Sequence, residues 1–175
     1  MNGIVDLFAS LFTRFTARPR PTGVGLIRGP EYDTMPGSWG ATADFMAQLA
    51  QYPTVAGWAH VCSELLAEGK RRGLDQHFRA GQSMQHMIFS TVSHHGLQDE
   101  LRVTVAIPTD EADSAATGAR LEVSLGRVNR WFAEPERLTI GPAADAWPLL
   151  AEYLRDLWRA TRSAPVPDGL GPGKL

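Results

Sequence analysis

The first periodic stretch of the chain is an apolar stripe within residues 3–16. The apolar positions recur every three or four residues, which places them on one face of a helix. They are Ile4, Leu7, Phe8, Leu11, Phe12 and Phe15. Proline and glycine then interrupt the chain over residues 17–40, a composition typical of a loop. We therefore expect residues 1–20 to form a separable amphipathic helix and residues 21–41 to form its linker.

The next stretch carries the pattern of two consecutive helices. Thr42 is a suitable N-cap for a short helix that ends at Pro53. A second helix is predicted from about residue 54 to residue 72. Its last turn holds three cations, which interact favourably with the negative end of the helix dipole. Gly73 follows, and a glycine at this position is typical of a left-handed cap. The apolar stripe of this second helix contains Val55, Trp58, Val61, Cys62, Leu65 and Leu66.

The apolar period changes towards two after Gly81, which indicates strands. Residues 85–93 are rich in strand formers, and residues 101–107 and 119–127 alternate between apolar and polar or small side chains. A fourth short strand is predicted over Arg137–Ile140. Strands that follow one another through loops favour an antiparallel meander.

An apolar stripe at helical spacing returns in residues 145–162, and it needs the apolar face of the sheet as its partner. The sequence thus predicts an α+β fold. An antiparallel meander of three to four strands packs against this C-terminal helix and the N-terminal helical pair. Residues 42–162 are expected to form one domain, and the Pro/Gly-rich residues 163–175 a disordered tail.

Composition and charge exclude few function classes. The chain of 175 residues is long enough for one stable core without disulfides, and it contains one cysteine. Its 17 basic and 19 acidic side chains argue against nucleic acid as a partner. No apolar run reaches the length of a membrane span, and the N-terminus lacks the pattern of a secretory signal. We therefore expect a cytoplasmic protein.

The densest group of catalytic residue types is the predicted hairpin loop with Ser93, His94, His95 and Asp99. A histidine base oriented by a carboxylate can serve acyl transfer, which makes a small hydrolase or transferase one hypothesis. The sequence has no GxSxG motif, no nucleotide-binding glycine motif and no close histidine spacing for a metal. The loop is therefore interpreted first as a solvated turn, and no metal or cofactor is expected.

Aromatic and arginine residues, which are enriched at binding hot spots, supply the other candidates. Trp39 lies between glycines in the predicted linker, and Arg130 and Trp131 lie in a basic, aromatic stretch between strands. Phe8, Phe12 and Phe15 form the apolar face of the first helix. Each of these groups can instead pack on its own domain.

The leading hypothesis is a non-enzymatic protein-binding domain, of the type of an adaptor, a secretion chaperone or a toxin-neutralising immunity protein. Its partner is another protein or a second copy of itself, held by the sheet face or by the N-terminal helix. A further alternative is a peripheral membrane protein anchored by residues 3–16.

Overall fold

The computed structural model describes residues 34–83, 86–92, 100–108, 120–127 and 135–171. Two antiparallel helices come first in this part of the chain, α2 at Met35–Leu49 and α3 at Ala56–Arg71. Thr34 caps α2, because its side-chain oxygen accepts a hydrogen bond from the backbone N–H of Gly37 at 3.0 Å. The predicted linker boundary at residue 41 is therefore wrong. Pro36 does not oppose the helix, because proline is tolerated in a first turn.

Five strands form one antiparallel sheet, in which every strand pairs with its neighbour in sequence. The strands are β1 Arg79–Ser83, β2 His86–Ser90, β3 Leu101–Ala106, β4 Arg120–Arg127 and β5 Arg137–Pro142. The predicted meander is thus correct in kind and one strand short. The missing strand is β1, whose sequence RAGQS has too few apolar residues to show a strand pattern.

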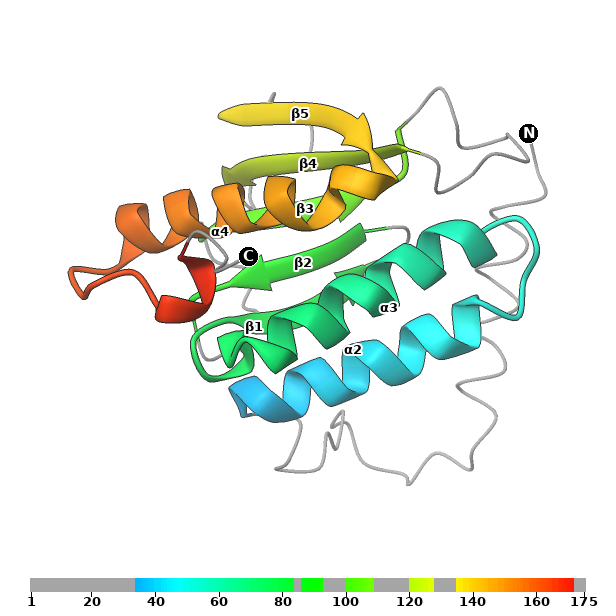
Figure 1. Ribbon diagram of the computed structural model, residues 1–175, viewed down its shortest axis with the longest axis horizontal. Coiled ribbons are helices and arrows are strands. Elements are labelled where there is room, and N and C mark those ends of the chain that lie inside the picture. Colours follow the sequence, from blue (N-terminus) through cyan, green and yellow to red (C-terminus); the bar gives the residue numbers. More distant parts are fainter. Residues whose placement is uncertain (1–33, 84–85, 93–99, 109–119, 128–134, 172–175) are drawn as a thin grey trace, which may run out of the picture.

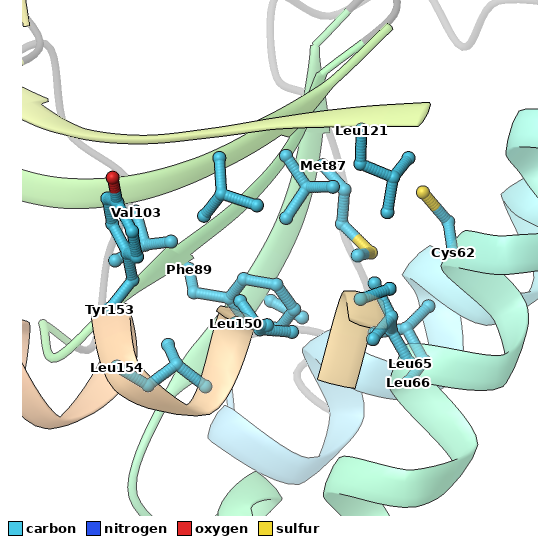
Figure 2. Packing of buried hydrophobic residues seen from close by; sticks show 14 of the residues in the cluster. Cys62, Leu65, Leu66, Met87, Phe89, Val103, Leu121, Leu150, Tyr153 and Leu154 are labelled. Carbon is cyan, nitrogen blue, oxygen red and sulfur yellow. The ribbon is translucent and has the colours of Figure 1, made fainter. Parts of the chain in front are cut away.

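The three α-helices of the described part of the chain all lie on one face of the sheet (Figure 1). The C-terminal helix α4, Ala146–Thr161, packs on β3 and β4, and α2 packs on β1. Alternate residues of the central strands point into this layer, where they meet apolar side chains from α3 and α4 (Figure 2). The α+β architecture and the packing of the C-terminal helix on the sheet are confirmed.

The chain after α4 returns to the domain, so the prediction of a disordered tail is wrong for residues 163–171. The indole N–H of Trp158 lies 3.0 Å from the carbonyl oxygens of Ala164 and Pro165. Arg155 donates to the carbonyl oxygen of Leu170 at 2.9 Å, and the Leu170 side chain is fully buried. A proline- and glycine-rich composition gives no sign of these contacts, because the donors belong to a different element.

Trp39 joins α2 to α3, to Phe78 just before β1, and to β2. Its indole N–H donates to the carbonyl oxygen of Phe78 at 2.6 Å, and its ring centroid lies 5.4 Å from that of Phe89. The ring is 2% exposed. On the α3 side it rests on Gly69, where an added Cβ atom would lie 2.6 Å from two ring carbons. A glycine inside this helix is therefore required by the close approach of the tryptophan.

We expect Gly69→Ala to destabilise the protein by about 1–3 kcal/mol, because the new methyl group overpacks a ring that cannot move aside. Gly40→Ala is the matched control, since its Cβ meets no atom within 4 Å in α2. That control should stabilise the protein by about 0.5–1 kcal/mol through helix propensity. Urea unfolding measures both, and a stabilising Gly69→Ala would contradict the packing described.

Two buried indoles should respond differently to loss of the N–H group. Trp58 is fully buried, and its indole nitrogen has no hydrogen-bond partner among the described residues, whereas that of Trp39 is bonded to Phe78. Both Trp→Phe changes remove the same atoms. We expect Trp39→Phe to cost about 1–2 kcal/mol more than Trp58→Phe, because only the former leaves a buried carbonyl without its donor. Equal losses in urea unfolding would show that this hydrogen bond does not stabilise the fold.

Candidate binding surface on the second face of the sheet

The second face of the sheet is turned away from the three α-helices of the described residues (Figure 1). The strand register orders its side chains in rows, because directly paired residues share a face. One row runs Ile88, Thr104, Ser124, Leu138 from β2 to β5. The next row runs His86, Ala106, Glu122, Ile140. Small and polar residues thus occupy its middle, and apolar residues lie on β5.

The two ends of this face differ in exposure. On β1 and β2, Arg79, Ser90 and Ile88 are buried, at 2%, 0% and 8% exposure. On β5, Leu138 and Ile140 are 45% and 41% exposed, and they are the exposed large hydrophobic residues of the described chain. The surface available to a partner is therefore the β5 end.

The orientation of β5 follows from what its other side chains bind. Arg137 forms ion pairs with Glu152 and Asp156 of α4, and its guanidinium lies 4.4 Å from the ring centroid of Tyr153. The hydroxyl oxygens of Thr139 and Tyr153 are 2.7 Å apart. Because Arg137 and Thr139 face the helix, the residues between and after them must face the other way.

The two edge strands of the sheet differ in the contacts that cover them. The backbone N–H of Ala80 on β1 donates to the hydroxyl oxygen of Ser38 at 3.1 Å, so α2 binds this edge strand. At the opposite edge, β5 forms backbone pairs only with β4 within the described ranges. An edge strand without such cover offers its outer N–H and C=O groups to another strand.

Burial perturbs the charged groups of the second face. The pKa of the Glu122 carboxyl is raised because Glu122 is partly buried. Burial also raises the pKa of Glu100, against the opposing charges of Arg102 and Arg79. The same burial lowers the pKa of Arg102, and the Glu100 carboxylate opposes that shift. All three pKa shifts have the direction expected of partly buried side chains, because burial disfavours the charged form.

The structure contradicts one of the candidate binding residues. Trp39 is part of the core and bonded to Phe78, so it is not available to a partner. A tryptophan between glycines resembles a loop residue in sequence, but the glycines here lie inside α2. The remaining candidates lie outside the described residues and stay predictions: Phe8, Phe12, Phe15, His94, His95, Asp99, Arg130 and Trp131.

Other chemical candidates of the described chain have structural roles. Cys62 is fully buried, and burial raises the pKa of its thiol, which suppresses the reactive thiolate. The cations at the end of α3 are engaged locally, because Arg71 and Arg72 both donate to Glu68. These hydrogen bonds lower the pKa of Glu68 to about 2. Gly73 has φ 74°, as the predicted left-handed cap requires.

The described residues contain no group of three or more His, Cys, Asp or Glu side chains that could hold a metal ion. No helix in the same ranges is long and apolar enough to cross a membrane. His60 and Glu64 form an exposed pair on α3 with 3.6 Å between Nε2 and Oε1, in agreement with the i, i+4 spacing.

No protein-family model, curated protein sequence or solved structure matches the chain.

We expect Glu122→Gln to raise the melting temperature at pH 7 and to leave it unchanged near pH 3.5. Glu122 lies between Ala106 and Ile140 across the strands, with Arg120 and Ser124 beside it on β4. Because its pKa is raised in the folded state, the native protein holds this proton more strongly than the unfolded chain does. The associated stability is present below the unfolded pKa and is lost as pH rises through the folded pKa.

The control for this change is Glu64→Gln, at a carboxylate whose side chain is 69% exposed on α3. In Glu64→Gln, the difference between the melting temperatures at pH 7 and near pH 3.5 should be the same as in the unchanged protein. If Glu122→Gln melted at the wild-type temperature at pH 7, burial would not destabilise the ionised form of Glu122.

Proposed function

We propose that this chain is a non-enzymatic protein-binding domain whose binding site is the β5 edge of the sheet. A segment of the partner lies beside β5 in extended conformation and adds a strand to the sheet. Its backbone supplies hydrogen bonds, and its alternate side chains cover Leu138 and Ile140. The observation that carries the proposal is the position of these two exposed apolar residues on the same face of an edge strand.

Single exposed apolar side chains are common on protein surfaces and need no explanation. The pair on β5 differs in its place. Proteins usually protect an edge strand with lysine, with proline, or with a covering element. Here α2 covers β1, whereas the outward-facing positions of β5 are Leu138, Ile140 and Pro142, and only the last of these opposes strand addition.

The attachment of β5 to α4 supports a binding role. The ion pairs of Arg137 and the hydroxyl contact of Thr139 hold the helix-facing side of the strand in one conformation. A strand that is already extended loses little conformational entropy when another strand joins it. The site is thus preorganised for strand addition.

The proposal is tested by a photo-crosslinking amino acid, p-benzoylphenylalanine, placed at position 138 of the full chain in the cells that produce it. The matched position is 64 on α3, whose side chain is exposed on the helical layer. We expect a crosslinked polypeptide from position 138 and not from position 64. Adding Ile140→Glu should reduce its yield about tenfold, because a carboxylate replaces an apolar contact at the centre of the site.

Because Ile140 is exposed, Ile140→Glu should change the stability of the fold by no more than about 0.5 kcal/mol. Circular dichroism and urea unfolding check this independently of binding. If position 138 yields no more crosslinked polypeptide than position 64, β5 is not a binding site.

A further inference from the structure

The sequence of β5 is complementary to itself when two copies are placed antiparallel about a two-fold axis at Thr139. In this register Leu138 of one copy lies opposite Ile140 of the other, and the same contact occurs a second time by symmetry. Leu138 and Ile140 of the two copies, which are exposed in the single chain, then form one apolar cluster. Apolar pairs directly opposite each other are a main source of stability between strands.

The same register avoids conflict on the helix-facing side. Arg137 of one copy lies opposite Gly141 of the other, so its ion pairs with Glu152 and Asp156 remain undisturbed. A two-fold axis at Arg137 would instead oppose two guanidinium groups, and like charges directly opposite are destabilising. An axis at Leu138 would place the Glu136 carboxylate against Ile140.

The charge nearest to the start of β5 does not oppose this register. Glu136, which precedes β5, has a partner in its own chain, because its Oε1 lies 3.5 Å from Nε of Arg127. In the Thr139 register Glu136 lies opposite Pro142 of the other copy, so no like charge faces it.

We propose that the occupant of the β5 edge is a second copy of this chain, paired antiparallel through β5 about Thr139. The two five-stranded sheets thereby become one continuous sheet. This inference rests on the proposed function and names the partner at the same site. An isologous contact of this kind closes on itself, so the assembly stops at a dimer and leaves no β5 edge exposed.

The register is tested with two single variants of the full chain, Leu138→Cys and Ile140→Cys, each purified and then oxidised alone or as an equal mixture. In the proposed dimer residue 138 lies opposite residue 140 of the other copy, within the range of a disulfide after small adjustment. Two copies of residue 138 lie on a diagonal, about 7–8 Å apart, which is too far. The native Cys62 does not compete, because it is fully buried.

We expect the mixture to give at least about five times more crosslinked dimer than either variant alone. The control mixture combines Leu138→Cys with Glu64→Cys, at an exposed position on α3, and should give only background. Sedimentation equilibrium of the unchanged protein should show a dimer. The double variant Leu138→Glu, Ile140→Glu should weaken that dimer at least tenfold, on the order expected for removing two apolar contacts.

Each other outcome overturns a defined part of the proposal. Efficient crosslinking of Leu138→Cys with itself would refute the register about Thr139. A monomeric protein with no crosslinking would refute the second copy as the occupant. In that case, a polypeptide of a different sequence captured at position 138 would leave β5 as a binding site, so the two proposals fail separately.

Discussion

Burial of one face of a five-stranded sheet is the constraint on which the rest of the structure depends. The three α-helices that the structure describes lie on the same side, and their apolar side chains meet those of the central strands in a single core. Since alternate residues of a strand point to opposite faces, this choice also decides what the second face displays. The second face has small and polar residues at its centre and two exposed apolar residues on β5. It also carries the carboxyl groups of Glu100 and Glu122, whose pKa values are raised by partial burial.

The asymmetry between the two sheet edges follows from the same packing. At β1, the indole of Trp39 and the hydroxyl of Ser38 connect α2 to the backbone, and the absence of a side chain at Gly69 allows this approach. At β5, the contacts with α4 use side chains only, chiefly that of Arg137. Among the described residues, one edge is therefore covered, whereas the other pairs only with β4, and this difference supports a binding role for β5.

The polar groups beside the β5 patch limit its size. Ser124 lies next to Leu138, and the Glu122 carboxyl lies next to Ile140, where partial burial already raises its pKa. A larger apolar surface on an open edge would promote indiscriminate association. The hydroxyl and the carboxylate therefore keep the apolar patch on β5 to two residues.

The sequence by itself determined the elements with strong local periodicity: the helices near residues 54–72 and 145–162, and the strands at 101–107 and 119–127. Tertiary structure decided the parts that depend on distant groups. The segment RAGQS forms a strand because it pairs with β2. Residues 163–171 accept hydrogen bonds from side chains of α4. Trp39 lies in the core, where its indole N–H donates to Phe78. The exposure of Leu138 and Ile140 was not predictable from the sequence. Alternation alone assigns apolar residues to the core. The pairing of β5 with β4, together with the ion pairs of Arg137 with α4, instead places these two residues on the opposite face.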